Sequence, residues 1–137
     1  SCTGGLIAKR ITDIPGSSAV FAGGCVAYTE RVKSLLLGVK PDTLAVHTAV
    51  SEAVAREMAE GIREKLGTDI GISTTGYAGP GGGTEKEPVG TVYVGISTSE
   101  GTQVTRFSFS SMRSRDYIRS LAAGRALLLA WKAAKCK

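Results

Sequence analysis

Residues 51–67 constrain the fold of this chain most, because they predict a helix with a defined start and a defined end. Ser51 is a suitable N-cap for the residues that follow it, and Gly67 closes the run. Four apolar residues recur inside the run at near-helical spacing: Val54, Met58, Ile62 and Leu66. We therefore expect a helix over residues 52–66.

Three strands are expected after this helix. Residues 69–75 (DIGISTT) have the composition of a buried strand, and they lead into residues 76–83, a loop too rich in glycine for regular structure. Residues 89–97 and 102–110 alternate as strands do, and residues 99–101 form the turn between them. The last two strands should therefore form an antiparallel hairpin.

The remaining elements are shorter, apart from one long helix at the end of the chain. Paired glycines inside the segment at 19–28 indicate a bulge or the close approach of another backbone. In chain order, the expected elements are a short helix over residues 6–11, a strand over 19–28, a helix over 30–37 closed by Gly38, and a helix over 115–135.

Helices alternate with strands in the first half, a hairpin follows, and a helix ends the chain. This order predicts an α/β fold, as a three-layer α/β/α sandwich on a mixed sheet. Binding sites in such sheets gather at strand ends, where loops open into a crevice. We therefore expect the site near Ser1, Ser18 and the glycine loop at residues 76–83.

Length and composition predict one soluble domain over residues 1–137. Hydrophobic residues make up 42% of the chain and charged residues 21%, as in ordinary globular domains. No apolar run approaches the ~20 residues that span a bilayer, so we expect a cytoplasmic protein without membrane contact. Because Ser1 is not a methionine, the native chain is expected to begin earlier, and an earlier strand or helix could complete the sheet beneath the site.

The net charge of +5 favours an anionic partner, either nucleic acid or a small phosphate. No aromatic residues are interleaved with the basic ones as in a stacking platform, so the last helix is expected to carry them as a solvated face. The basic residues of the last quarter are Arg113, Arg115, Arg119, Arg125, Lys132, Lys135 and Lys137.

Three cysteines are present at Cys2, Cys25 and Cys136, an odd number without C-x-x-C spacing. This pattern favours reduced thiols over a disulfide framework or a zinc site, and no metal is expected. The glycine loop lacks both the Gly-Lys-Ser/Thr ending of a phosphate-binding P-loop and the G-x-G-x-x-G frame of a dinucleotide site. It either aims backbone N–H groups at an anion or is a mobile connection.

A serine needs a base to become a nucleophile, and the candidate bases differ in quality. His47 is the only histidine and has no obvious aspartate partner, so a Ser-His-Asp triad is not expected. Lys33 can act as the base where burial lowers its pKa, and Tyr28 lies five residues before it. The residues alone leave two interpretations open: a Ser-Lys hydrolase, or a solvent-exposed Lys33 without a chemical role.

Five motifs occur in order: S-C-T-G-G, P-G-S-S, Y-x-x-x-x-K, T-G-x-A-G-P-G-G-G-T and P-V-G-T-V-Y. Over nearly its whole length the chain resembles the C-terminal domain of the competence-damage-inducible CinA proteins. That resemblance implies a nicotinamide-nucleotide amidohydrolase, which converts nicotinamide mononucleotide to nicotinate mononucleotide and ammonia in pyridine-nucleotide salvage. It also implies a metal-free reaction and a homodimer. We expect no cofactor and no nucleic-acid partner.

The resemblance also assigns the site residues. Ser1 and Ser18 become the two serines and Lys33 the general base. Tyr28, counted with these catalytic residues, and Thr75 line the pocket and help to hold the amide or the oxyanion. Gly76 also binds the substrate, and Arg115 meets the substrate phosphate. One serine attacks the carboxamide carbon, Lys33 passes its proton to the departing ammonia, and water hydrolyses the acyl-enzyme. Which serine attacks is open, with a preference for Ser18 and a proton relay through Ser1.

Two segments depart from the family pattern, residues 29–31 and residues 111–114, so Arg113 is an alternative to Arg115 at the phosphate.

Two further interpretations of the protein's function remain. One is a non-catalytic binding or partner domain, because longer members of the family join this domain to a second one. The other is a nucleic-acid-binding protein, which the positive charge favours but no groove-reading motif supports.

Overall fold

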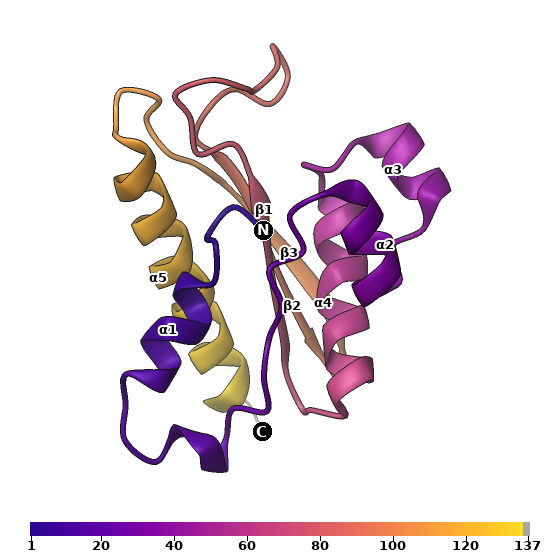
Figure 1. Ribbon diagram of the computed structural model, residues 1–137, viewed down its shortest axis with the longest axis vertical. Helices are drawn as coiled ribbons and strands as arrows, with labels where there is room; N and C mark the ends of the chain where they lie inside the picture. The colour runs from indigo at the N-terminus through magenta and orange to yellow at the C-terminus, as the bar shows by residue number, and fades with distance from the viewer. Residues whose placement is uncertain (136–137) are drawn as a thin grey trace.

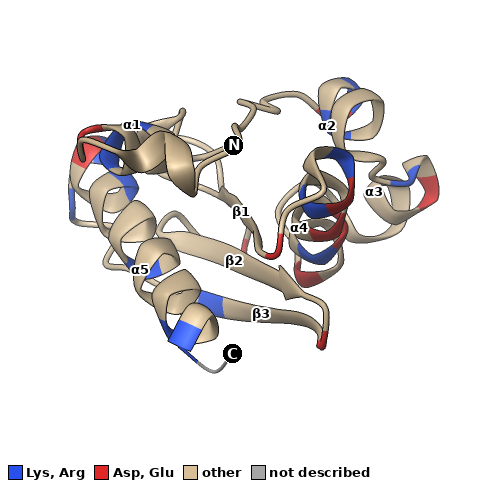
Figure 2. Cartoon of the chain, turned by 90° about the horizontal axis from the view of Figure 1, so that it is seen from below, with Lys and Arg blue, Asp and Glu red and all other residues tan. Residues whose placement is uncertain are grey.

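The computed structural model describes residues 1–135, in which helices cover both faces of a three-stranded sheet (Figure 1). One face carries α4 (Glu52–Leu66), with α2 (Glu30–Leu37) and α3 (Pro41–His47) against it. The opposite face carries α5 (Arg115–Lys135) and α1 (Leu6–Thr12), as the end-on view also shows (Figure 2). The expected three-layer α/β/α arrangement is confirmed.

The sheet consists of β1 (Gly71–Gly76), β2 (Thr91–Thr98) and β3 (Gly101–Ser108), in that spatial order. Both neighbouring pairs are antiparallel, so the expected hairpin is confirmed. On β2, Val92, Val94 and Ile96 pack into one cluster with Ile118 and Ala122 of α5. The alternate residues of β2 face α4, as expected for a strand covered on both sides.

Close packing of α4 on the sheet depends on Gly95 of β2. A Cβ atom there would lie 2.6 Å from the Ala55 carbonyl oxygen and 2.6 Å from Ser73 Oγ. Ser73 Oγ itself donates a 2.6 Å hydrogen bond to the same Ala55 oxygen. The helix can therefore approach the strand closely only because residue 95 has no side chain.

Within residues 1–135 the sheet is wholly antiparallel, where a mixed sheet was expected. The expected strand over residues 19–28 does not form. Its first residue ends a 3₁₀ turn (Ser17–Ala19), Val20 still belongs to that turn, and residues 21–28 have no strand pairing. In the described chain, no backbone N–H or C=O group of residues 22–26 forms a hydrogen bond. A β-prone composition cannot make a strand without a neighbouring backbone to pair with.

The helix boundaries predicted from capping residues are confirmed. Ser51 Oγ accepts a hydrogen bond from the Val54 amide at the start of α4, and Gly67 ends the helix in the left-handed conformation, at φ 60°. Gly38 ends α2 in the same way, at φ 69°. Both glycines are required there, because other residues adopt this conformation with strain.

The helix α3 was not expected from the sequence. Pro41 occupies its first turn, where the missing N–H of proline costs nothing. Leu44 is the buried residue of this helix, and His47 lies exposed in its last turn. The signal was present in the sequence as a proline followed by an aspartate and a leucine, but seven residues give too little periodicity to recognise.

The structure can be compared with the expectations about the cysteines and about the basic residues of α5. Cys2 and Cys25 are free thiols, as expected, while Cys136 and Lys137 lie outside the described residues. Basic residues are spread along α5 (Figure 2). Arg119 is an exception to a purely solvated face, because its Nη2 donates to the Thr3 carbonyl at 3.2 Å. No helix within residues 1–135 has the length and apolarity to cross a bilayer.

Candidate functional site

A cavity of about 200 Å³ lies at the end of β1, where the glycine loop begins. It collects residues from the N-terminus, from the segment before α2, from α2 and from the start of α5. Six of the seven residues expected at the site line it: Ser1, Tyr28, Lys33, Thr75, Gly76 and Arg115. Residues separated by more than a hundred positions in the chain are therefore brought together at one end of the sheet.

Ser18 is the expected residue that does not line this cavity. It lies exposed in the 3₁₀ turn (Ser17–Ala19), and it borders a larger groove of about 960 Å³, which Ser1 also lines and Lys33 does not. The seven residues of α1 separate Ser1 from this turn, and a helix of that length spans about 10 Å. Ser1 is thus the serine that shares the cavity with Lys33, and Ser18 is not placed beside them.

Lys33 is almost completely buried, with 2% of its surface exposed. Its Nζ donates to the Ala27 carbonyl at 3.0 Å and to the Tyr28 carbonyl at 3.4 Å. Desolvation lowers the pKa of this amine, although the negative charge of Glu30 acts in the opposite direction. The interpretation of Lys33 as a solvent-exposed residue is therefore wrong.

Ser1 is held at the free edge of β1. Its backbone nitrogen donates to the Thr74 carbonyl at 2.5 Å, and Thr3 Oγ1 lies 3.1 Å from Thr74 Oγ1. The turn that follows needs Gly4, which has φ 58° and where a Cβ would lie 2.6 Å from Arg119 Nη2. The S-C-T-G-G motif thus forms a tight turn that is hydrogen-bonded to Thr74 of the sheet on one side and to Arg119 of α5 on the other.

Cys2 lies next to Ser1 and is also in the cavity wall. Burial raises the pKa of its thiol, and 7% of its surface is exposed. Because the thiolate is the nucleophilic form of cysteine, a raised pKa makes Cys2 a poor nucleophile at neutral pH. Cys2 also packs in the apolar cluster with Val92 and Ile118, whereas Ser1 is only half-buried, so the hydroxyl of Ser1 is the better candidate.

Arg115 joins two walls of the cavity. Its Nη1 donates to the Gly79 carbonyl at 2.8 Å, and its Nη2 donates to the Tyr28 hydroxyl at 3.3 Å. Both Tyr28 and Arg115 are exposed, so the guanidinium marks the open side of the cavity. Arg113 lies over the Tyr117 ring, 4.9 Å from its centre, and does not line the cavity.

Thr75 is buried, with 1% of its surface exposed, and its hydroxyl is already engaged. Oγ1 donates to the Ala49 carbonyl at 2.7 Å, which fixes the segment after α3 against β1. Gly76 must remain small, because a Cβ there would lie 2.6 Å from the Thr91 carbonyl oxygen. These two residues shape the cavity wall.

The glycine loop brings backbone donors to the cavity. Ala78 and Gly79 both line it, and within residues 1–135 their N–H groups have no hydrogen-bond acceptor. Free N–H groups in a loop of this kind can stabilise a developing oxyanion. The expectation of a loop that presents backbone donors is consistent with this arrangement.

The sequence did not reveal the residues that fasten the far end of this loop. Glu87 accepts a 2.6 Å hydrogen bond from the Tyr93 hydroxyl and hydrogen bonds of 3.2 and 3.0 Å from Nε and Nη2 of Arg106. Tyr93 and Arg106 are direct cross-strand partners in the β2–β3 pair. Opposite charges on Glu87 and Arg106 were visible in the sequence, but their proximity depends on the strand register.

Known proteins resemble this chain closely. A CinA-like protein of Myxococcus xanthus is 54% identical over 128 residues, which are 93% of this chain and 30% of that protein. A CinA-like protein of Chloroherpeton thalassium is 63% identical over 99 residues, 72% of this chain and 24% of that protein. The chain therefore spans less than a third of the length of these two relatives.

Solved structures agree with the fold. The competence/damage inducible protein CihA of Agrobacterium tumefaciens superposes with a TM-score of 0.91 at 38% identity, over 94% of this chain and 78% of that one. The competence damage-inducible protein A of Klebsiella pneumoniae gives a TM-score of 0.91 at 37% identity, over 98% and 83%. The sequence model of the family described as "CinA C-terminal domain" matches residues 1–133 of this chain. This chain belongs to the CinA C-terminal domain family.

Proposed function

We propose that this domain hydrolyses the carboxamide of nicotinamide mononucleotide to nicotinate mononucleotide and ammonia, with Ser1 as nucleophile and Lys33 as general base. One observation carries the chemical part of the proposal: a lysine with 2% exposure and a lowered pKa shares a small cavity with a serine. The choice of substrate rests on the family resemblance. The geometry supports the reaction class and the positions of the reacting groups.

The sequence favoured Ser18 as the nucleophile, and the positions of the side chains favour Ser1 instead. A relay from Ser18 through Ser1 to Lys33 requires all three side chains in one place, and Ser18 borders a different groove. A nucleophile and its base must come within hydrogen-bond reach during the reaction. We therefore propose Ser1 as the attacking residue and assign Ser18 no chemical role.

The proposed reaction proceeds in two stages. Neutral Lys33 accepts the proton of the Ser1 hydroxyl as the oxygen attacks the carboxamide carbon, and the N–H groups of Ala78 and Gly79 stabilise the oxyanion. Lys33 then returns the proton to the departing nitrogen, which leaves as ammonia, and an acyl-Ser1 ester remains. A water molecule, deprotonated by Lys33, attacks that ester, and Lys33 then returns the proton to the Ser1 oxygen as the carboxylic acid leaves.

The size of the cavity fits the reacting end of the substrate. At about 200 Å³ it is smaller than the roughly 300–1,000 Å³ of sites that enclose drug-sized ligands. We propose that it takes the pyridine ring and its carboxamide, while the ribose phosphate extends past Tyr28. Arg115 stands on that open side, where its guanidinium can bind a phosphate through two parallel hydrogen bonds.

Release of ammonia from nicotinamide mononucleotide tests the proposal. Removal of a general base slows catalysis by about 10²–10⁴-fold, so Lys33→Met should reduce ammonia release by at least that lower factor. Lys40→Met is the matched control, because the side chain of Lys40 is 77% exposed and lies outside the cavity. Equal activity of the two folded variants would refute the role of Lys33. No ammonia release by the folded parent chain would favour a non-catalytic partner domain instead.

A further inference from the structure

Two arginines one helical turn apart on α5 contact segments that form the wall of the cavity. Arg115 donates from Nη1 to the Gly79 carbonyl at 2.8 Å, in the glycine loop. Arg119 donates from Nη2 to the Thr3 carbonyl at 3.2 Å, in the turn that begins with Ser1. Residues four apart on a helix lie on the same face. One face of α5 therefore holds both the glycine loop and the serine turn.

The Arg119 contact is built into the serine turn. The Thr3 carbonyl also accepts a hydrogen bond from the Leu6 amide at 3.2 Å. Within the same turn, the Ser1 carbonyl accepts a hydrogen bond from the Gly4 amide at 3.1 Å. Gly4 leaves room for the guanidinium, because a Cβ atom there would lie 2.6 Å from Arg119 Nη2. The turn therefore packs directly against the Arg119 side chain.

The ion pair of Arg119 contributes little to the position of its guanidinium. Asp116 Oδ1 lies 3.6 Å from Arg119 Nη1, but the Asp116 side chain is 94% exposed. An exposed ion pair is weak and is screened by salt. Within residues 1–135, the Thr3 carbonyl is the hydrogen-bond acceptor of Arg119, so this contact directs the side chain to the turn.

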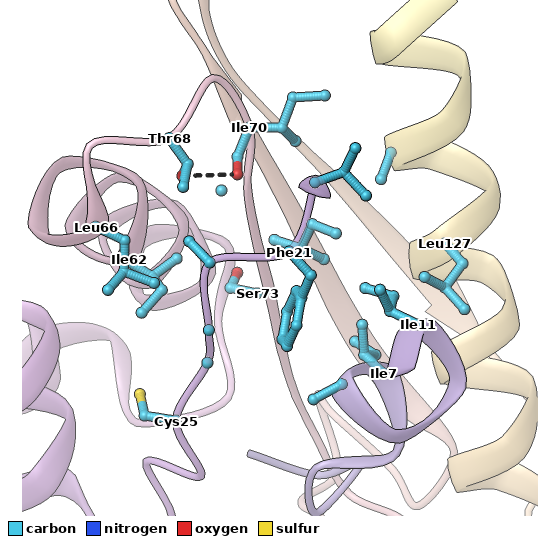
Figure 3. Close-up of a pocket in the computed structure, with 18 of the residues that line it drawn as sticks. Ile7, Ile11, Phe21, Cys25, Ile62, Leu66, Thr68, Ile70, Ser73 and Leu127 are labelled. Atoms are coloured by element: carbon cyan, nitrogen blue, oxygen red, sulfur yellow. Dashed lines mark hydrogen bonds between the residues drawn. The ribbon is translucent and has the colours of Figure 1, made fainter. Parts of the chain in front are cut away.

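Helix α1, which follows the serine turn, is attached to α5 independently of Arg119. Arg10 of α1 donates to the Ser120 carbonyl at 2.9 Å and to Ser120 Oγ at 2.7 Å. Ile7 of α1 and Leu127 of α5 both line the larger groove from this layer (Figure 3). Loss of the Arg119 contact would therefore free the turn and leave the helix in place.

We propose that Arg119 is a positioning residue, which fixes the Ser1 hydroxyl where it can attack the carboxamide carbon. The inference rests on the proposed function, because it assigns Arg119 a role in the reaction of Ser1. The Thr74 contacts hold the turn on the β1 side, and Arg119 holds it on the α5 side. Arg119 does not line the cavity, so it acts through the turn. A misplacement of about 1 Å at the reacting atoms slows catalysis by about 10²-fold.

Steady-state kinetics with nicotinamide mononucleotide separate this role from substrate binding. Arg119→Met should lower kcat by about 10–100-fold and leave KM unchanged, because the turn shifts while the phosphate contact stays. Arg119→Lys should recover part of the loss, since an ammonium can still donate to the Thr3 carbonyl. The matched control is Arg10→Met, which removes an arginine contact between the same two helices and should leave kcat unchanged.

Hydrogen exchange supplies a readout that does not depend on activity. The Gly4 and Leu6 amides close the turn, so they should exchange at least about tenfold faster in Arg119→Met than in the parent or in Arg10→Met. Equal exchange in Arg119→Met and the parent would overturn the inference, as would an unchanged kcat. An equal loss of kcat in Arg10→Met would also overturn it, because Arg119 would then be one of several purely structural contacts. Failure of the proposed function has a different signature: no ammonia release by the folded parent chain, with the difference in exchange retained.

Discussion

Lys33 Nζ donates a 3.0 Å hydrogen bond to the Ala27 carbonyl, and this contact holds a buried amine at the wall of the cavity that contains Ser1. Both acceptors of Lys33 are neutral carbonyl groups, of Ala27 and Tyr28. Carbonyl oxygens orient the amine without the full stabilisation of its positive charge that a carboxylate would give. Desolvation therefore dominates and lowers the pKa of Lys33, which suits a general base.

The lowered pKa of Lys33 predicts that stability depends on pH. Below its folded-state pKa the native protein holds a buried ammonium, and above that value it releases the proton while the unfolded chain keeps it up to about pH 10.5. The free energy of unfolding of the parent chain, relative to that of Lys33→Met, should therefore rise with pH across this window. Urea denaturation of both proteins between neutral and alkaline pH measures it. A difference that stays constant would contradict the lowered pKa.

Arg115→Ala should weaken substrate binding more than it slows the chemical step. Hydrogen bonds to charged groups contribute about 1.5–3 kcal/mol, which corresponds to a rise in KM of roughly 10–100-fold if Arg115 binds the phosphate. Steady-state kinetics with nicotinamide mononucleotide give KM and kcat separately. Arg113→Ala is the matched control, because Arg113 stacks on Tyr117 outside the cavity. A larger effect from Arg113→Ala would move the phosphate site to that residue.

Tyr93→Phe should remove one of the hydrogen bonds that hold Glu87, at the far end of the glycine loop, against the sheet. The change removes the hydroxyl that donates to Glu87 at 2.6 Å and leaves the ring in place. We expect the free energy of unfolding to fall by about 1 kcal/mol, the usual net value of such a hydrogen bond. Chemical denaturation measures it, with Tyr117→Phe as the control on an exposed tyrosine. Equal stability of both variants and the parent would show that the Tyr93–Glu87 contact contributes nothing.

Gly95→Ala should destabilise the packing of α4 on the sheet. The new Cβ would lie 2.6 Å from the Ala55 carbonyl, so the backbone of the helix or the strand has to move. Overpacking of this kind costs about 1–3 kcal/mol. The control is Gly81→Ala, where a Cβ meets nothing within 4 Å. If thermal denaturation gave the same midpoint for both variants, the close approach would not be a constraint.

Local signals in the sequence predicted the helices well, because their ends are marked by residues with a defined role. Ser51 and Gly67 delimit α4, and Gly38 ends α2, since capping and left-handed turns depend on single side chains. Pairing between strands was harder to predict. Residues 22–26 have a strand composition, but within residues 1–135 their backbone has no hydrogen-bond partner, and composition alone cannot supply one.

The candidate site could be predicted in part. Motif resemblance identified six residues that the structure places around one cavity, because the end of β1 and the starts of α2 and α5 meet there. It could not determine that α1 separates Ser18 from Ser1, nor that Lys33 is buried. The Glu87 contacts were also missed, because they depend on the register that places Tyr93 opposite Arg106.

Identification of the acylated residue tests the central claim most directly. The parent chain, Ser1→Ala and Ser18→Ala would each be mixed with nicotinamide mononucleotide, quenched in acid during turnover and digested for mass spectrometry. We predict an acyl ester on the peptide that contains Ser1, in the parent and in Ser18→Ala, and none in Ser1→Ala. An ester on Ser18 that persists in Ser1→Ala would contradict it.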